Sequence, residues 1–323
     1  MFAVYCEKPD DADPLSALRV GERPAPDVPE GWVRVRVSHA SLNRHDIFTL
    51  RGITGQDTPI PFPMILGNDA AGCLDDGTGV VLYPLITDAD RADDETLDPA
   101  WHVLSEKVQG TLADFVTVPR RNVLALPAGF SPLYASVLGT AWLTAYRMLF
   151  VKSGLRPGQT MLVQGATGGV STALIQMGCA AGMEVWATSR GRDGTELASR
   201  LGAYRVFASG TPLPNRVDAV FDSVGAATWD HSLASVKRGG TVVTMGVTTG
   251  KTVHLDLLPV IMNQLVIKGS IMATRSEMLD MIQFVVRHGI IPQIGQVMPM
   301  EQAREGFEAM CTGRQQGKIV LTR

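Results

Sequence analysis

The chain has 323 residues, which is long enough for two domains of ordinary size. Lys and Arg number 29 and Asp and Glu number 32, so the formal net charge is −3. This balance argues against nucleic acid or an anionic membrane as a partner, because both attract a basic excess. Hydrophobic residues are 45% and charged residues 19% of the chain, a composition that supports a large core and excludes general disorder.

The four cysteines lie far apart, at Cys6, Cys73, Cys179 and Cys311, and no CxxC or CxxH pair occurs. This spacing predicts free thiols rather than a disulfide framework or a cysteine-rich zinc site. The N-terminal residues show no basic region followed by an apolar run, and no apolar span of about 20 residues is present. We therefore expect a cytoplasmic protein that does not cross a membrane.

Residues 1–129 have the pattern of short strands separated by turns. The sequence WVRVRV at 32–37 alternates apolar and charged residues, which is typical of a half-buried strand. Further strands are expected at 79–85 and 113–118, and Pro and Gly recur between the strands. The segment therefore predicts a small antiparallel barrel or sandwich.

Residues 130–267 alternate strands with helices. Strands are predicted at 161–165, 184–189, 218–225 and 241–246, and helices at 172–181, 195–203 and 231–240. This alternation indicates a parallel, doubly wound α/β sheet. In the last segment, 268–323, we expect helices near 276–287 and 300–311 and a strand at 318–322 that pairs back onto the first segment.

A glycine-rich turn joins the first strand of this α/β region to its first helix. Its sequence is Gly165-Ala166-Thr167-Gly168-Gly169-Val170-Ser171. Glycine lets the backbone turn sharply and bring N–H groups close to an anion, and the helix N-terminus adds partial positive charge. Because the turn lies between a strand and a helix, it predicts dinucleotide binding; a purely structural turn is the alternative.

The second strand of the α/β region ends in Thr188-Ser189-Arg190-Gly191-Arg192. NAD-binding sites usually place Asp or Glu at this tip, where the carboxylate binds the ribose 2′-hydroxyl. Here the tip has no acid, whereas a hydroxyl and two guanidinium groups suit a 2′-phosphate. We therefore predict NADP(H) as the cofactor, with Ser189, Arg190 and Arg192 at the phosphate; a solvated basic loop is the alternative.

Several blocks together resemble the medium-chain dehydrogenase/reductase superfamily, in its zinc-free branch near the quinone oxidoreductases. They are ASLNRHDIFTLRG (40–52), PFPMILGNDAAG (61–72), GTLADFVTVP (110–119), LTAYRMLF (143–150), LVQGATGGVS (162–171), GSIMATRSEM (269–278) and GKIVL (317–321). The resemblance implies a GroES-like catalytic domain at 1–129 plus 268–323, interrupted by a Rossmann dinucleotide-binding domain at 130–267.

The same resemblance permits a test for zinc. Zinc-dependent relatives carry a cysteine ligand at the equivalent of Asn43 and a His-Glu pair at the equivalent of Asn68-Asp69, and asparagine is a poor zinc ligand. They also carry four cysteines around 86–103, a stretch that is acidic and free of cysteine here. The resemblance therefore implies that no metal is bound.

Without a Lewis acid, the resemblance implies hydride transfer from NADPH to a quinone or an α,β-unsaturated carbonyl, whose conjugation spreads the developing charge. Asn43 and Asp46 are the candidate catalytic residues. Asn43 is expected to hydrogen-bond the substrate or the nicotinamide carboxamide, and Asp46 to orient Asn43 or a water. A structural role for both residues in their loop is the alternative.

Further contacts to the cofactor follow from the resemblance alone. They involve Thr140, Thr144, Gly246, Val247, Ala273 and Lys318. The resemblance also implies a homodimer formed by continuing the Rossmann sheet, and the apolar stretch from Thr252 to Met272 is the candidate edge. Two other functions remain open: an alcohol or aldehyde dehydrogenase of the same superfamily, and a non-catalytic NADPH-binding sensor or partner protein.

Overall fold

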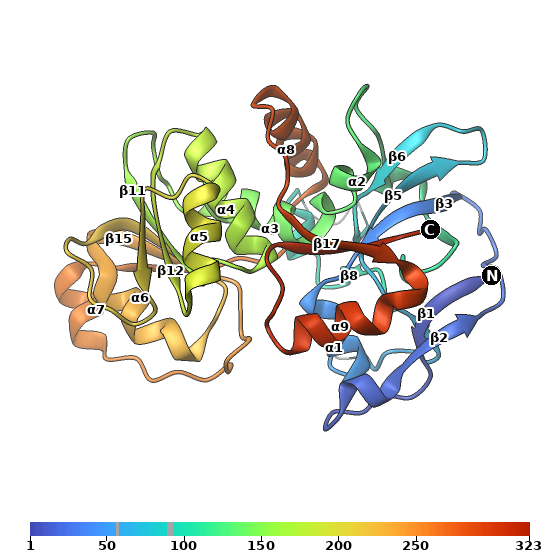
Figure 1. Cartoon of the computed structure of the whole chain (residues 1–323), viewed down its shortest axis with the longest axis horizontal. Coiled ribbons are helices and arrows are strands. Elements are labelled where there is room, and N and C mark those ends of the chain that lie inside the picture. Colours follow the sequence, from blue (N-terminus) through green and yellow to red (C-terminus); the bar gives the residue numbers. More distant parts are fainter. Residues whose placement is uncertain (56–57, 89–92) are drawn as a thin grey trace. The chain divides into compact units, whose positions relative to one another are not determined.

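The computed structural model describes residues 1–55, 58–88 and 93–323, and these form two compact units (Figure 1). Unit 1 contains residues 1–141, 274–282 and 294–323, and unit 2 contains residues 142–273 and 283–293. Among the described residues, no helix has the length and apolar character needed to cross a bilayer.

Unit 1 is built from sheets whose strands pair antiparallel, except that the last two strands in sequence pair parallel to each other. A three-stranded sheet has the order β2-β1-β4, and a larger sheet has the order β10-β6-β5-β3-β18-β17, with β9 also paired to β3. The strands are β1 (Phe2–Cys6), β2 (Leu18–Glu22), β3 (Trp32–Ser41), β4 (Met64–Ile65), β5 (Asp69–Leu74), β6 (Gly79–Leu82), β7 (Leu85–Ile86), β8 (His102–Val103), β9 (Phe115–Pro119), β10 (Val123–Ala125), β17 (Ile294–Pro299) and β18 (Lys318–Thr322). Its helices are α1 (Arg44–Leu50), α2 (Pro132–Ala135) and α9 (Ala303–Cys311), and α8 (Arg275–Arg287) begins in this unit.

Strand β3 follows the expected alternation. Val33, Val35 and Val37 are buried in the core, while Arg34 lies at the surface and pairs with Asp75 at 3.1 Å. The terminal strand β18 pairs antiparallel with β3, so the C-terminal segment does return to the first segment as expected. The predicted strand at 79–85 is interrupted, because β6 ends at Leu82 and a separate strand, β7, begins at Leu85.

Unit 2 contains a parallel sheet of order β13-β12-β11-β14-β15-β16 in the described residues. The strands are β11 (Thr160–Gln164), β12 (Glu184–Ser189), β13 (Arg205–Ala208), β14 (Val217–Asp222), β15 (Val236–Thr244) and β16 (Val266–Gly269). The helices are α3 (Leu143–Tyr146), α4 (Gly169–Ala180), α5 (Arg192–Arg200), α6 (Trp229–Ser235) and α7 (Leu257–Asn263), and α4, α5 and α6 pack on the sheet (Figure 1). The strand order reverses between β11 and β14, and such a switch point is where parallel α/β sheets bind ligands.

One predicted element in unit 2 is wrong. We expected a helix over 231–240 that ends in Lys237 and Arg238, but α6 ends at Ser235 and residues 236–244 form β15. Val236 is fully buried and pairs with Val217, so sheet pairing overrides the helical propensity of this stretch. Lys237 therefore projects from a strand, where its Nζ binds Asp218 at 2.9 Å.

The two units differ from the expected domains in two places. Residues 130–141 belong to unit 1, where α2 packs against β5 and β6, although we expected them in the Rossmann domain. Residues 283–293 belong to unit 2: Phe284 stacks on Phe150 with ring centroids 5.1 Å apart, and Gln176 donates to the Ile291 carbonyl at 2.7 Å.

Candidate active site

Asp46 is a fully buried carboxylate in the first turn of α1. Its Oδ2 accepts a hydrogen bond from the backbone N–H of Asn43 at 2.7 Å, and its Oδ1 accepts one from the backbone N–H of Gly67 at 2.8 Å. Burial raises the pKa of Asp46 to about 6, although these two N–H groups and the charges of His45 and Lys318 act in the opposite direction. Asp46 thus fixes the start of α1 against the chain just before Asn68.

Asp69 is the centre of a buried polar cluster in unit 1. Its Oδ2 accepts hydrogen bonds from Ser41 Oγ and Asn43 Nδ2, each at 2.9 Å. Its Oδ1 accepts one from Thr140 Oγ1 at 2.5 Å. The Lys318 ammonium lies 3.3 Å from Oδ2. The fold therefore brings together three predicted site residues, Asn43, Thr140 and Lys318, around a carboxylate that the sequence analysis did not assign a role.

Lys318 is 3% exposed, and its ammonium is bound by three oxygens. Nζ donates to Leu42 O at 2.7 Å and to Asn43 Oδ1 at 2.5 Å, besides its contact with Asp69. An ammonium has three hydrogens, so these acceptors use all of them. Burial lowers the pKa of Lys318, and Asp69 opposes that shift. A contact of Lys318 with the cofactor stays a prediction, and it would require one of these bonds to be exchanged.

The positions where zinc-dependent relatives carry ligands hold two side-chain amides, Asn43 and Asn68, and one carboxylate, Asp69. Asn68 Nδ2 donates to the Leu104 carbonyl, and its Oδ1 is buried without a partner in the described part of the chain. Asn43 and Asp69 are both bonded to the Lys318 ammonium. No cluster of three or more His, Cys, Asp or Glu suited to a metal occurs within 1–55, 58–88 and 93–323; residues 89–92 of the stretch expected to lack a zinc lobe lie outside these ranges.

The glycine-rich turn lies where β11 joins α4. Gly165 has φ +74°, a conformation that favours glycine, and its N–H donates to Thr188 Oγ1 at 3.1 Å. The Ala166 N–H donates to the Thr188 carbonyl at 2.9 Å. Both N–H groups are therefore hydrogen-bonded to β12. The first backbone hydrogen bond of α4 runs from the Thr172 N–H to the Gly168 carbonyl. The N–H groups that precede Thr172 at the start of α4 are the ones left to bind an anion.

A second buried polar network lies beneath this turn. Thr188 Oγ1 donates to Gln164 Oε1 at 2.8 Å, and Gln164 Nε2 donates to Ser232 Oγ at 3.0 Å. Ser232 Oγ donates to Asp222 Oδ2 at 2.7 Å. Gln164, Thr188, Asp222 and Ser232 are all fully buried. None of the four is in the predicted site, because a single polar residue at the end of an apolar strand gives no signal of its partners on other strands.

The predicted 2′-phosphate residues differ in their surroundings. Ser189 Oγ donates to the Gly191 carbonyl at 2.8 Å, and Arg192 Nε pairs with Glu196 at 2.7 Å. Arg190 is exposed at the end of β12, and no hydrogen bond or ion pair to it occurs in the described residues. Arg190 is therefore the guanidinium of this loop that is available to a phosphate without loss of an existing pair.

Close approaches of neighbouring atoms explain two other glycines, one just after β15 and one in the first turn of α5. A Cβ at Gly246 would overlap the Ser223 carbonyl, so only glycine fits at this predicted site position. A Cβ at Gly194 would overlap the Ser189 hydroxyl and lie 2.9 Å from the Thr167 methyl group. The sequence analysis missed Gly194, although a glycine in the first turn of α5 was a signal for close packing. 

The remaining predicted cofactor residues also lie in unit 2. Val247 is 51% exposed just after β15, whereas Thr144 and Ala273 are buried. The structure thus describes all of these positions but does not test their contacts with a cofactor.

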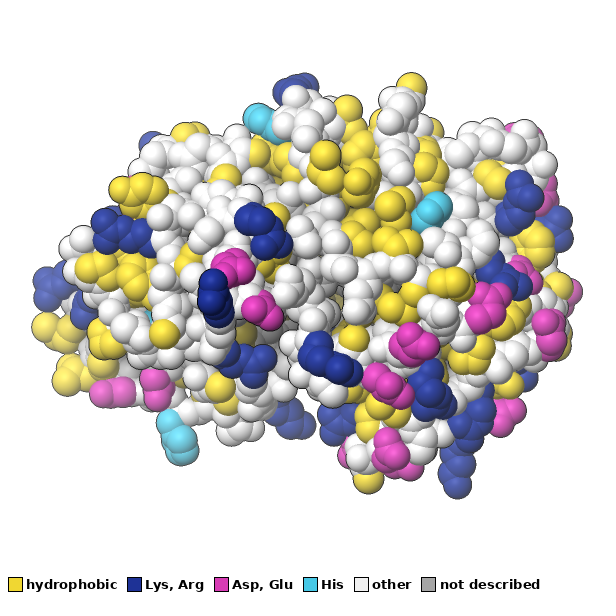
Figure 2. All heavy atoms as spheres, in the orientation of Figure 1, with side chains coloured by type: hydrophobic (Ala, Val, Ile, Leu, Met, Phe, Trp, Pro, Cys, Tyr) yellow, Lys and Arg dark blue, Asp and Glu magenta, His cyan; other side chains and the backbone are white. Residues whose placement is uncertain are grey.

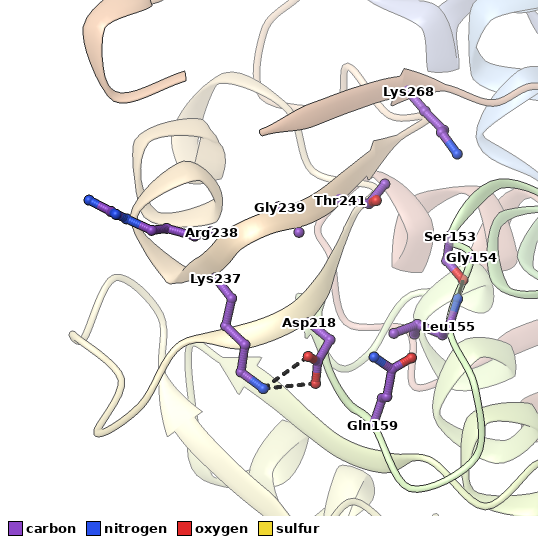
Figure 3. A pocket seen from close by; sticks show the side chains of 11 residues that line it. Ser153, Gly154, Leu155, Gln159, Asp218, Lys237, Arg238, Gly239, Thr241 and Lys268 are labelled. Carbon is purple, nitrogen blue, oxygen red and sulfur yellow. Dashed lines mark hydrogen bonds and ion pairs between the residues drawn. The ribbon is translucent and has the colours of Figure 1, made fainter. Parts of the chain in front are cut away.

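A pocket of about 430 Å³ lies at the amino ends of the unit 2 strands, away from the glycine-rich turn (Figure 3). It is lined by residues at the amino ends of β11, β14 and β15, including Gln159, Asp218 and Thr241. Lys237 points to Asp218 and pairs with it, while Arg238 points away (Figure 3). Because the glycine-rich turn follows the carboxyl end of β11, this pocket is not part of the predicted cofactor site.

Two family models match the chain. The alcohol dehydrogenase GroES-like domain matches residues 29–128, and the zinc-binding dehydrogenase family matches residues 169–287. The probable acrylyl-CoA reductase AcuI of Escherichia coli is 30% identical over 310 residues, which cover 91% of this chain and 92% of that protein. An alcohol dehydrogenase of Geobacillus stearothermophilus is 28% identical over 333 residues, covering 94% of this chain and 95% of that protein.

Solved structures agree with these matches. The crystal structure of an NAD-dependent alcohol dehydrogenase covers 100% of both chains with a TM-score of 0.92 at 30% identity. The chain therefore belongs to the medium-chain dehydrogenase/reductase superfamily, with a GroES-like domain and a Rossmann sheet. The protein is an NAD(P)-dependent oxidoreductase.

Proposed function

We propose that this protein is a zinc-independent, NADPH-dependent oxidoreductase that transfers hydride to a quinone or an α,β-unsaturated carbonyl. The observation that carries the proposal is the buried Asn43–Asp69–Lys318 cluster, which replaces metal-binding chemistry with a fixed ammonium. NADPH supplies the hydride when it is bound, and unit 2 supplies the N–H groups of α4 and the Arg190 guanidinium for its phosphates.

The donor set supports zinc independence. Zinc prefers thiolate, imidazole and carboxylate ligands, and of Asn43, Asn68 and Asp69 only Asp69 offers one. Its two oxygens already accept four hydrogen bonds, one of them from the Lys318 ammonium. A divalent cation beside that ammonium would meet strong like-charge repulsion. Although one matching family is described as zinc-binding, these side chains do not fit a catalytic zinc ion.

The relatives favour an activated alkene as the substrate. The Escherichia coli protein and a protein of Sulfurisphaera tokodaii that is 25% identical over 327 residues are both acrylyl-CoA reductases by name. Their substrates by that name carry a carbon–carbon double bond conjugated to a carbonyl, which accepts hydride without a Lewis acid at the oxygen. The second candidate function is alcohol dehydrogenase, which the Geobacillus stearothermophilus relative supports and which zinc chemistry would normally serve.

We further propose a homodimer in which β16 of two copies pair. β16 is the last strand in the sheet order, and Val266 and Ile267 on it are 40% and 36% exposed. The preceding helix α7 exposes Leu258 and Ile261 by 64% and 66%, and Figure 2 shows hydrophobic side chains at the surface over α7. An open edge beside an apolar helix favours association with a second copy.

Cofactor preference and zinc independence are tested together by two calorimetric titrations, one with NADPH and one with NADH. Both use protein whose zinc content has been measured. We expect less than about 0.1 zinc per chain and tighter binding of NADPH. Arg190→Ala should weaken NADPH about 10-fold or more and leave NADH nearly unchanged, because one charge-assisted phosphate contact is lost. Arg192→Ala, whose guanidinium is already paired with Glu196, is the matched control and should have a smaller effect.

Two outcomes would contradict the proposal. Stoichiometric zinc would favour the alcohol dehydrogenase function. Arg190→Ala that weakens the binding of NADPH and of NADH equally would contradict the assignment of Arg190 to the 2′-phosphate. Turnover of a 2-alkenal and of a quinone with NADPH then separates the enzyme from a non-catalytic NADPH-binding protein.

A further inference from the structure

The buried network beneath the glycine-rich turn has a single direction. The Gly165 N–H donates to Thr188, Thr188 donates to Gln164, Gln164 donates to Ser232, and Ser232 donates to Asp222. Each hydroxyl or amide in the middle both accepts and donates, so the chain of bonds is polarised towards one carboxylate. Bonds arranged in this way strengthen one another in a low-dielectric interior.

The network also reaches a second loop. Asp222 Oδ1 accepts from the Val224 amide at 2.9 Å and from the Gly225 amide at 3.0 Å. This loop packs on the end of β15, because a Cβ at Gly225, which has φ +97°, would lie 2.9 Å from the Gly246 carbonyl. The side chains thus connect the ends of β11, β12 and β14, which flank the switch point of the sheet.

Gln164 is the residue that makes this connection possible. Its Oε1 must accept from Thr188, whose oxygen already accepts the Gly165 N–H. Its Nε2 carries two hydrogens, which are directed to Ser232 Oγ at 3.0 Å and to His231 Nδ1 at 2.8 Å. An amide offers one acceptor and two donors in a fixed plane, whereas a carboxylate could not donate and an apolar side chain could do neither.

We propose that Gln164, through Thr188 and Ser232, is a positioning residue that holds the glycine-rich turn and the 222–225 loop in the geometry that binds the cofactor. The inference rests on the proposed nucleotide binding of unit 2. Folding already orders the turn, so the ligand does not have to supply that free energy when it binds. Loss of any one hydrogen bond in the series therefore reduces the affinity for the nucleotide. Ser232 is the most informative place to break it, because Ser232 lies on α6, two side chains away from the turn.

The experiment measures the NADPH dissociation constant by calorimetry for Ser232→Ala, Thr188→Val and Thr188→Ser. We expect Ser232→Ala and Thr188→Val each to weaken binding about 3- to 10-fold, as for the loss of one buried hydrogen bond. Thr188→Ser keeps the hydroxyl and should bind nearly as well as the wild type. The double variant should weaken binding by less than the product of the two single effects, because both changes break the same chain.

Ser235→Ala is the matched control. Ser235 is a buried serine on the same helix, and no hydrogen bond from its side chain occurs in the described residues. This variant should leave the NADPH dissociation constant within about 2-fold of the wild type.

A second measurement does not depend on ligand or activity. Amide hydrogen exchange of the cofactor-free protein should become faster at Gly165 in Ser232→Ala, while the Leu162 amide in the middle of β11 keeps its protection. Equal acceleration at both amides would indicate general loss of stability and would overturn the positioning role.

Failure of the proposed function and failure of the positioning role give different results. Wild-type protein that binds neither NADPH nor NADH would overturn the proposed function and this inference with it. Wild-type protein that binds NADPH, together with Ser232→Ala and Thr188→Val variants of unchanged affinity, would overturn only the inference.

Discussion

Asp46 shows how a single residue combines a structural role with a pH dependence. The folded protein raises its pKa from the ordinary value of 3.8 to about 6, mainly through burial. A carboxyl group with a raised pKa holds its proton more tightly in the folded state than in the unfolded state. Its contribution to stability is therefore complete below about pH 3.8 and is lost as the pH rises through about 6.

We predict that Asp46→Asn removes this dependence. A shift of this size corresponds to about 3 kcal/mol, and the group is fully buried, so solvent screening is small. Urea unfolding at several values between pH 4 and pH 7 measures the free energy for both proteins. The difference, wild type minus variant, should fall as the pH rises. A difference that is constant with pH would show that Asp46 is already ionised at pH 4 in the folded protein.

Lys318 is a buried lysine whose surroundings depend on residues far away in the sequence. The motif GKIVL places a lysine where the resemblance implies a cofactor contact, and a lysine in a sequence is usually taken as a surface group. Here the ammonium is buried and surrounded by Leu42 O, Asn43 Oδ1 and Asp69 Oδ2. Its position depends on the pairing of β18 with β3, which joins residues such as Val320 and Ser41, 279 positions apart in the chain.

At the level of elements, α5 packs closely on the end of β12, next to the loop at 189–192 where we propose that the 2′-phosphate binds. Gly194 allows this close approach, since a Cβ there would overlap the Ser189 hydroxyl and approach the Thr167 methyl group. Helices usually tolerate alanine better than glycine, so the intrinsic propensity favours the opposite residue at this position. The glycine is therefore explained by packing.

We predict that Gly194→Ala weakens NADPH binding about 10-fold while the fold is retained, because Ser189 and Thr167 must both move. Gly191→Ala is the control: an added Cβ at Gly191 meets nothing within 4 Å, and its φ of −158° is accessible to alanine. Calorimetric titration with NADPH measures both variants. Equal affinities for the two would show that the packing of α5 does not influence the loop.

At the level of the whole molecule, the open edge of the unit 2 sheet determines the expected assembly. We predict that Ile261→Glu converts a dimer into a monomer, because it places a charge in an apolar surface that is 66% exposed in the single chain. Light scattering after gel filtration should report a mass near 34.7 kDa for the variant and twice that for the wild type.

Val297→Glu is the control for this prediction. It places the same charge on an exposed apolar residue of β17 in unit 1, at 50% exposure, and should leave the dimer intact. A wild-type protein that is monomeric at micromolar concentration, or an Ile261→Glu variant that remains dimeric, would contradict the β16 interface.

Local patterns in the sequence were sufficient for much of the fold. The alternation in Trp32–Val37, the strand ending at Gln164 and the terminal strand from Lys318 were predicted within a few residues, because their patterning agrees with their burial. The prediction of a helix over 231–240 was wrong because Val236 pairs with Val217 in the sheet. This is a long-range interaction, and local propensity gives no information about it.

The sequence by itself determined the family, the glycine-rich turn and the absence of an acid after β12, since each depends on residue types at short spacing. Only the tertiary structure decided which polar groups meet. It brought Asp69 to Lys318, which are 249 residues apart, and joined Gln164 to Ser232, which are 68 residues apart. The physical reason is that a buried polar group must find a partner, and the partner is chosen by strand order and register rather than by neighbours in the chain.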